Sequence, residues 1–211
     1  MNFKSSVADR SARRRPIRNL HWGIFAGALI IGMGVAACTP PTVQTEKEPI
    51  MTYPTLPERQ SPRPETTGSV PHQQIGVDPV PDVNEELFRR AFALPGVENR
   101  PSTFSLPGAR GLWINESVTI VRQDQIVSGR EFAHIHPDGS LHASLPLDRA
   151  REAVDAGWAE PQPIADQLGV PGLVMIFTPQ THEELKSVLQ LIVDSYNFVT
   201  GSKIDVADLG E

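Results

Sequence analysis

One stretch of the chain, residues 129–147, constrains the fold more than any other because it encodes a β-hairpin. Residues 131–136 and 140–145 each alternate in polarity, and they flank the turn Pro137–Gly139. Proline suits the second position of a type I turn, and glycine supplies the left-handed residue that follows it in a three-residue loop. The sequence therefore predicts two antiparallel strands joined by a three-residue loop.

The loop length decides which side chains share a face of the hairpin. A three-residue loop pairs His134 with His142, and opposed residues lie on the same face. This register predicts one polar face and one apolar face, formed by His134, His136, Ser140 and His142 and by Ala133, Ile135 and Leu141. A two-residue loop would pair Ile135 with His142 and separate the histidines. Pro137 favours the three-residue loop.

Three histidines on one face can have three different roles, and the sequence alone does not decide among them. They can bind Zn, Fe or Cu, although a carboxylate ligand is not evident, since Glu131 has the wrong parity and Asp138 lies in the turn. They can act without a metal as general bases, because imidazole titrates near neutral pH. They can also be structural residues that hydrogen-bond to the backbone or to Ser140. His72 and His182 are expected to lie in solvent.

Composition and motifs exclude several classes of protein. A net charge of −6 gives no reason to expect nucleic-acid binding. The single cysteine, Cys38, excludes an intramolecular disulfide and a Cys-rich zinc site. The chain contains no Walker loop, no GxGxxG dinucleotide motif and no GxSxG nucleophile elbow.

Residues 1–38 predict export and lipid attachment. A basic segment precedes the uncharged apolar run Leu20–Ala37, and Val35–Cys38 has the form of a bacterial lipobox. Two acyl chains on Cys38 would anchor the protein stably in a membrane, whereas one chain is marginal. Thr39 stands where Gram-negative inner-membrane lipoproteins typically carry aspartate, which favours an outer-membrane lipoprotein facing the periplasm. An uncleaved signal or simple membrane anchor is the alternative.

Residues 39–81 predict a disordered linker that holds the domain away from the membrane. This segment carries half of the 20 prolines in the chain and few large apolar residues. Such a composition cannot bury enough apolar surface to offset the entropy lost on ordering. The alternative is that part of the segment packs on the domain as a strap.

Residues 82–211 predict one α+β domain, a small antiparallel sheet with helices packed on one face. Apolar periodicity indicates three helices, over about 82–93, 148–156 and 181–200. Capping boxes are expected at Asp82 with Glu85 and at Thr181 with Glu184. A loop with short extended pieces is expected at 97–111 and a loop at 159–171. Strands are expected at 112–114, 117–122, 131–136, 140–145 and 173–178.

Several of these segments resemble the luciferase domain of fungal bioluminescence, which also occurs in bacterial proteins. Most of the matching segments lie between Gly129 and Gly201, and they are Arg130–His136, Leu141–His142, Ala156–Trp158, Gly169–Phe177 and Glu183–Thr200. A further match covers Pro107–Arg110 together with Trp113. Fungal luciferases oxygenate a hydroxylated styrylpyrone with dioxygen. They are not assigned a metal or an organic cofactor.

The resemblance implies an oxygenase that acts on a small phenol or pyrone without a metal or cofactor. Three histidines would be catalytic and would deprotonate the substrate hydroxyl, namely His134, His136 and His142. Arg130 and Arg110 would offset the charge of the resulting anion, and Trp113 would contact the substrate. The alternative is a non-catalytic envelope module that binds a small molecule or assists assembly. A concave apolar pocket at the histidines favours the enzyme, and a flat wet face favours the module.

Overall fold

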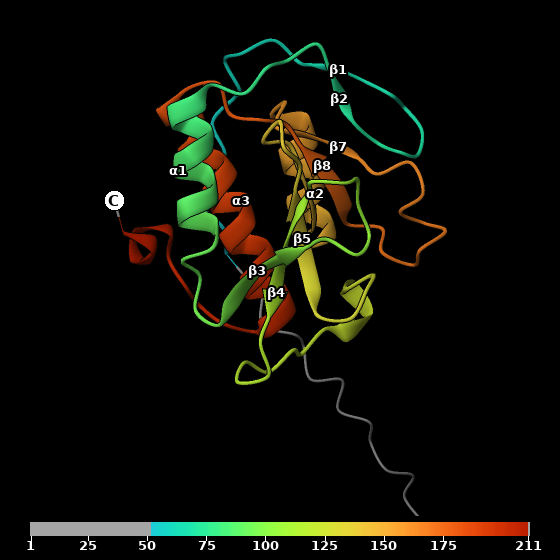
Figure 1. Ribbon diagram of the computed structural model, residues 1–211, viewed down its shortest axis with the longest axis vertical. Coiled ribbons are helices and arrows are strands. Elements are labelled where there is room, and N and C mark those ends of the chain that lie inside the picture. Colours follow the sequence, from blue (N-terminus) through green and yellow to red (C-terminus); the bar gives the residue numbers. More distant parts are fainter. Residues whose placement is uncertain (1–51, 211) are drawn as a thin grey trace, which may run out of the picture. The chain divides into compact units, whose positions relative to one another are not determined.

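The structure is a computed structural model that describes residues 52–210. The predicted signal peptide, Cys38 and the linker residues 39–51 lie outside this range. Within it, a six-stranded antiparallel sheet and three α-helices form an α+β fold, as the sequence predicted (Figure 1). No helix in the described range is long and apolar enough to cross a membrane.

The predicted hairpin forms the centre of the sheet. Neighbouring strands are all antiparallel and follow the order β3-β4-β5-β6-β8-β7. Their bounds are Val97–Pro101 for β3, Arg110–Ile114 for β4, Glu131–Ile135 for β5, Leu141–Ser144 for β6, Ala159–Pro161 for β7 and Leu173–Ile176 for β8. Edge strand β7 lies in a segment that was expected to be a loop, and β3 is one of the short extended pieces expected within 97–111. Each contains a proline, a residue that sheets accept mainly at their edges.

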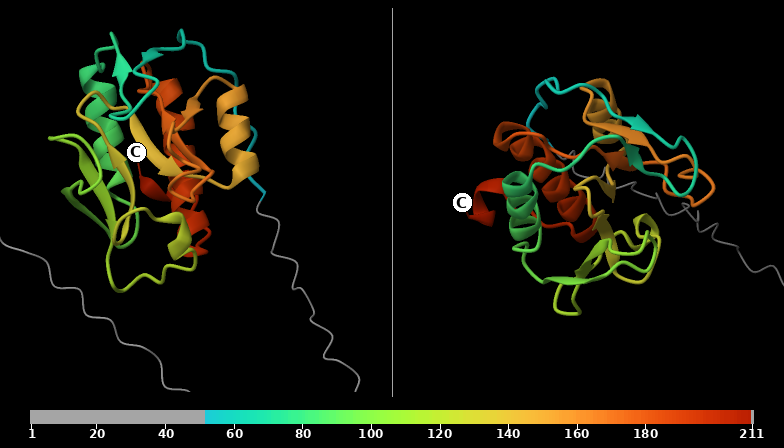
Figure 2. Two further views of the ribbon diagram at one scale, coloured as in Figure 1. Left: turned by 90° about the vertical axis from the view of Figure 1, so that its right-hand side faces the viewer. Right: turned by 45° about the horizontal axis from the view of Figure 1, so that its top comes forward.

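Three helices, α1 (Pro81–Ala91), α2 (Leu147–Asp155) and α3 (His182–Thr200), pack around the sheet. Helices α1 and α3 lie side by side, and α3 contacts the central strands β5 and β6 (Figures 1 and 2). Helix α3 begins and ends where predicted, because the Thr181 hydroxyl accepts a hydrogen bond from the Glu184 amide and Gly201 is left-handed. The predicted capping box is incomplete, since the Glu184 carboxylate accepts from the Gln180 amide and not from Thr181. Its apolar residues form the centre of the core, where Val188, Leu189 and Ile192 are fully buried.

Two local predictions are wrong. Helix α1 begins with Pro81 in its first turn and Val80 as the N-cap, so Asp82 does not cap it. Proline suits this position because the first amides of a helix have no partner within it. Residues 117–122 form a loop and not a strand, because the amides of Val121 and Arg122 donate to the Val199 carbonyl at the end of α3.

Residues 52–80, called the strap below, pack on the domain, which corrects the predicted disorder for this part of the linker. The strap contains a small hairpin, β1 (Glu65–Thr66) with β2 (Gln74–Ile75), and it continues directly into α1 (Figure 2). Its backbone bonds to side chains of the domain. The Leu56 amide donates to Glu152 at 2.9 Å, and the Trp158 indole donates to the Pro57 carbonyl at 2.6 Å. Composition missed this packing because the partners lie far along the chain.

Candidate functional site

The hairpin of β5 and β6 has the predicted register. His134 pairs with His142, and Ile135 pairs with Leu141. The loop is the three-residue type, because the His136 amide donates to the Ser140 carbonyl at 2.8 Å. Gly139 supplies the positive φ of 83° that this loop requires. The alternative two-residue loop is excluded.

The other strands extend the histidine face across the sheet. Gly111 on β4 pairs with His134, and Met175 on β8 pairs with both His142 and Glu160 of β7. These five residues form one row on the side of the sheet that faces away from the core. The strap and the loops at 102–108 and 162–170 cover this side, so their residues reach the histidines.

The three predicted histidines come together and are buried. His134 is 6% exposed, His136 is 3% exposed and His142 is 4% exposed. One ring nitrogen from each lies within 4.8 Å of those of the other two. The flat wet face that would favour a non-catalytic module is therefore not observed.

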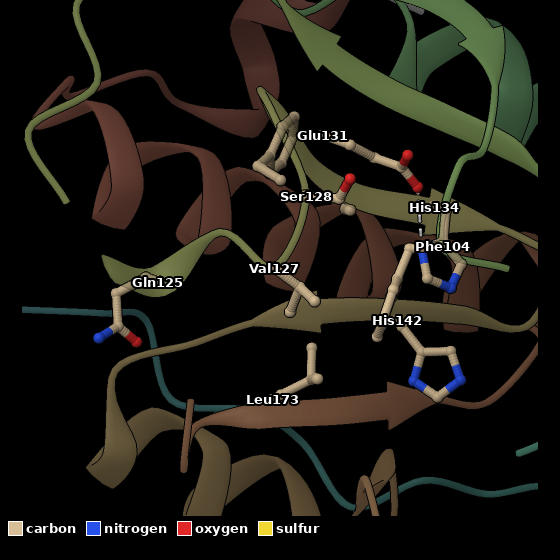
Figure 3. A pocket seen from close by; sticks show the side chains of 10 residues that line it. Phe104, Gln125, Val127, Ser128, Glu131, His134, His142 and Leu173 are labelled. Carbon is tan, nitrogen blue, oxygen red and sulfur yellow. Dashed lines mark ion pairs between the residues drawn. The ribbon is translucent and has the colours of Figure 1, made fainter. Parts of the chain in front are cut away.

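Glu131 contacts His134, which corrects the prediction that this carboxylate lies on the wrong face. Its Oε1 lies 3.2 Å from Nδ1 of His134 (Figure 3). A bulge in β5 explains the change of face, because Leu112 pairs with Ala133 while Trp113 pairs with Glu131. Since one strand residue is left over between these pairs, the alternation of faces shifts by one.

The Glu131 carboxylate is held by several donors. It accepts hydrogen bonds from the Ser102 hydroxyl and from the Thr103 amide, the latter at 2.9 Å. Burial raises the pKa of Glu131, but hydrogen bonds from His134, Ser102 and Thr103 lower it by more, so its pKa falls below the usual range. Gly111 makes room for it, because a Cβ there would lie 2.9 Å from Cδ of Glu131. Glu131 is therefore an ionised acceptor for the Nδ1 proton of His134.

His136 also has a fixed proton position. Its Nδ1 lies 3.0 Å from the Ser140 hydroxyl oxygen, and that hydroxyl lies 2.7 Å from Oδ1 of Asp138. A serine hydroxyl has one proton to donate, and a carboxylate can only accept. Ser140 therefore donates to Asp138 and accepts from Nδ1 of His136, which leaves Nε2 of His136 with its lone pair.

His142 is oriented by the strap. Its Nε2 lies 3.4 Å from the His72 carbonyl, which can only accept, while its Nδ1 is buried without a hydrogen-bond partner in the described residues. Burial and the neighbouring His134, His136 and His72 lower the pKa of His142 well below its usual value. Burial, together with His134 and His72, likewise lowers the pKa of His136 to about 4. Both rings are therefore neutral at physiological pH.

His72 is a fourth buried histidine of this site, not the solvated residue that the sequence predicted. It is 4% exposed, and its ring centroid lies 5.3 Å from that of His142. Its Nε2 lies 2.6 Å from Glu160, and the same carboxylate binds Arg63 at 2.8 Å. Its Nδ1 is buried without a hydrogen-bond partner among residues 52–210. The proline-rich surroundings of His72 give no local signal of this role.

A concave pocket lies at the histidines, as the enzyme reading expected. Its volume is about 260 Å³, and its apolar wall comes from the strap and two loops, with the lining residues Val70, Pro71, Phe104, Leu106 and Ile164. All four buried histidines line it as well.

A second cavity of about 20 Å³ lies beside His134, His142 and Glu131 (Figure 3). This second space suits one water-sized group.

The three predicted substrate-binding residues line neither cavity. The Arg130 guanidinium donates to the carbonyls of Ile114, Asn115 and Val118, so it holds a loop. Arg110 donates to Asn99 on the neighbouring strand.

Trp113 lies beside Gly111 on the histidine face, because a Cβ on Gly111 would come within 2.6 Å of its indole nitrogen. His182 is exposed as predicted, and it pairs with Asp82 and Glu86.

Comparison with known proteins agrees with the resemblance seen in the motifs. A luciferase from Armillaria gallica is 30% identical over 174 residues, which cover 72% of this chain and 64% of that protein. A luciferase from Armillaria mellea is 31% identical over 170 residues, which cover 70% of this chain and 62% of that protein. The chain thus spans slightly less than two thirds of the length of these relatives.

A shorter match joins the chain to a luciferase from Neonothopanus nambi, with 30% identity over 94 residues. It covers 41% of this chain and 35% of that protein. No solved structure matches the chain. The luciferase domain family matches residues 129–195, the part that contains the hairpin, β8 and most of α3. Residues 129–195 therefore match the luciferase domain, in the part of the chain where the histidine hairpin indicated it.

Proposed function

We propose that the protein is an oxygenase that joins dioxygen to a small hydroxylated aromatic compound, a phenol or a pyrone. The observation that carries this proposal is the pocket in which four imidazoles, three of them in the stretch that matches the luciferase domain, face an apolar wall. Its volume of about 260 Å³ lies just below the range of roughly 300–1,000 Å³ for drug-sized ligands. A single small aromatic molecule suits this space.

The first step is removal of the hydroxyl proton, and His72 is the best-placed base. Its Nε2–H donates to Glu160, which leaves Nδ1 with a lone pair, and the His72 residue lines the pocket. A carboxylate that orients an imidazole in this way is a recurring arrangement for general bases. The substrate proton moves to Nδ1, and the electron pair stays on the substrate oxygen and delocalises into the ring.

The second step joins the anion to dioxygen. A ring carbon forms a bond to one oxygen atom, and both oxygen atoms remain in the product as a peroxide. The proton held by His72 returns to that peroxide, so that substrate and dioxygen together give a hydroperoxide and His72 is regenerated. The apolar side chains of Phe104 and Leu106 form part of the wall of the pocket in which this anion would lie.

Oxygen uptake by the purified whole chain tests the proposal. A panel of phenols and hydroxypyrones should contain a compound that the protein consumes together with dioxygen. His72→Ala should lower the rate by about 10²–10⁴-fold, the usual contribution of a general base. His182→Ala removes an exposed histidine and should leave the rate unchanged. Binding of panel compounds without oxygen uptake would instead identify a non-catalytic binding module.

The proposal extends to the place of the protein in the cell. A bacterial lipoprotein acylated at Cys38 would hold the domain at the outer membrane, facing the periplasm. The support is the sequence alone, namely the basic segment, the apolar run and the lipobox. Small aromatic compounds would then reach the domain on the periplasmic side.

A further inference from the structure

We propose that His134, His136 and His142 bind one divalent transition-metal ion. The inference deepens the proposed function and rests on it for the chemistry, but metal binding itself can be measured without a substrate. It differs from the expectation drawn from fungal luciferases, which implied no metal. The reason is the position of each imidazole proton in this chain.

His134 and His136 both direct their protons away from the cluster. Nδ1–H of His134 donates to the Glu131 carboxylate at 3.2 Å. Nδ1–H of His136 donates to Ser140, whose own proton is used by Asp138. A neutral imidazole with one protonated nitrogen has a lone pair on the other. Both rings therefore have Nε2 as a free donor atom.

His142 provides the third free donor. Its Nε2–H is directed to the His72 carbonyl, and its Nδ1 is buried without a hydrogen-bond partner in the described part of the chain. A buried polar atom left without a partner is costly, so native proteins rarely keep one without a reason. Three lone pairs in one cluster repel each other unless a cation or a proton donor lies between them.

The donor atoms are close enough to share an ion after small movements. One ring nitrogen from each histidine lies within 4.8 Å of those from the other two, whereas nitrogens bound at about 2.0–2.1 Å to one tetrahedral ion lie about 3.4 Å apart. Small rotations of the imidazole rings, which move each nitrogen by about 1 Å, would bring the three nitrogens to this separation. Neutral imidazoles suit Zn, Cu, Fe and Ni, and carboxylate-rich sites suit Mg and Ca. The site therefore favours a first-row transition metal.

Glu131 has the position of an outer partner and not of a ligand. Metal-binding histidines commonly donate their second ring proton to a carboxylate, which fixes the ring and raises the basicity of the ligand nitrogen. The contact between Glu131 and His134 has this form. His72 stays outside the donor set, because the cluster of ring nitrogens within 4.8 Å of one another contains only His134, His136 and His142. The same pocket can thus hold a metal and keep a base.

Three histidine ligands leave coordination positions open toward the pocket. A redox-active ion there would supply the one-electron chemistry that dioxygen requires, and any divalent ion would polarise a substrate oxygen. The chain itself supplies the orientation of the rings, the apolar wall and the His72 base.

Metal binding by the purified whole chain tests the inference. The protein, stripped with chelator, should bind about one equivalent of Co²⁺ or Zn²⁺, followed by the visible absorbance of Co²⁺ and by elemental analysis. Single replacements His134→Ala, His136→Ala and His142→Ala should each weaken binding by at least about tenfold. His182→Ala should not, although this exposed residue lies beside Asp82 and Glu86 and could bind metal weakly.

Glu131→Gln tests metal binding with little change to the fold, because it replaces one side-chain atom and removes no metal ligand. It should weaken Co²⁺ binding by about 10–100-fold, as outer-partner changes do, with an unchanged circular dichroism spectrum. The inference is overturned if the folded wild-type protein binds no stoichiometric metal. It is also overturned if His182→Ala, and not the pocket variants, removes the bound ion.

The two proposals fail separately. Metal bound at the three histidines without oxygen uptake on any compound supports the metal site and removes the oxygenase. Full oxygen uptake by chelator-stripped protein that elemental analysis shows to be free of metal overturns the metal site and leaves the oxygenase with His72 as its base.

Discussion

At the residue scale, burial and close neighbours disfavour a charge on His136 and His142. The rings of His134, His136 and His142 lie 5.2–5.4 Å apart, measured between centroids. Two positive charges about 5 Å apart would repel each other by about 3 kcal/mol at an effective dielectric constant of about 20. The lowered pKa values of His136 and His142 follow from this proximity and from burial. Neutral imidazoles can accept protons or bind metals, and both proposals use this property.

A pair of substitutions on α3 tests whether single residues carry the stability that their burial indicates. Leu189 is fully buried, so Leu189→Ala should lower the free energy of unfolding by about 2–5 kcal/mol. Lys186 has a side chain that is 66% exposed, and Lys186→Ala should cost less than about 0.5 kcal/mol. Urea denaturation measures both values. Equal losses for the two variants would contradict the observed face of the helix.

Residue positions were predictable where the cause is local. The pairing of His134 with His142 follows from the turn beside them, so sequence alone places it correctly. The approach of Glu131 to His134 depends on a bulge against β4, a partner about 20 residues away, which strand alternation does not reveal. His72 depends on Glu160, 88 residues along the chain. Its contribution to the site therefore requires the fold to be known.

At the scale of elements, the strap is held by one carboxylate from each of three elements. Glu152 of α2 accepts from the Leu56 amide, Glu184 of α3 accepts from the Ser61 amide, and Glu160 of β7 pairs with Arg63 and His72. Burial raises the pKa of each carboxyl group, but the hydrogen bonds and cations around it lower the pKa by more. Strap docking is therefore linked to pH.

Acid should release the strap. A carboxyl group whose pKa is lowered by docking contributes stability above its undocked pKa of about 4.5, and this stability is lost as the pH falls through the docked value. The Leu56 and Ser61 amides should thus lose protection from hydrogen exchange below about pH 4.5, after correction for the intrinsic effect of pH. Constant protection of these amides between pH 7 and pH 3.5 would contradict this linkage.

A matched variant separates strap release from general acid unfolding. Glu184→Gln leaves Arg59, whose side chain is 2% exposed, without its nearest counter-charge at 3.6 Å. Loss of one member of a buried ion pair costs about 3–5 kcal/mol, so the strap should be less protected already at pH 7. Amides in β5 and β6 report on the domain and should stay protected in this variant.

Whole elements were also predictable where their signals are local, and not where they depend on contacts far along the chain. Helix α3 was predictable at both ends because its capping residue Thr181 and its terminal Gly201 are local signals. The loop at 117–122 was not, because its amides bind the end of α3 almost 80 residues later. The predicted α+β class is nevertheless correct, since it depends on the long periodic segments and not on the short edge strands.

At the scale of the whole molecule, the ordered strap shortens the proposed tether. Only residues 39–51 now lie between Cys38 and the part of the chain that the structure describes. Thirteen such residues span at most about 50 Å when fully extended, since each residue adds no more than about 3.6 Å. The proposed lipoprotein would therefore keep its pocket within one or two domain diameters of the membrane. Compounds near the membrane surface would then be within reach of the histidines.

Cys38→Ser tests this arrangement, because no other thiol exists in the chain to be acylated. Cells that make the wild-type protein with a palmitate analogue should label it, and the variant should carry no label. Without acylation the variant should appear in the soluble fraction or keep its signal segment. Thr39→Ala, which retains the cysteine, is the control and should keep both the label and the membrane association. Undiminished labelling of Cys38→Ser would remove the lipobox assignment, and the luciferase domain would then need another route to the membrane or none.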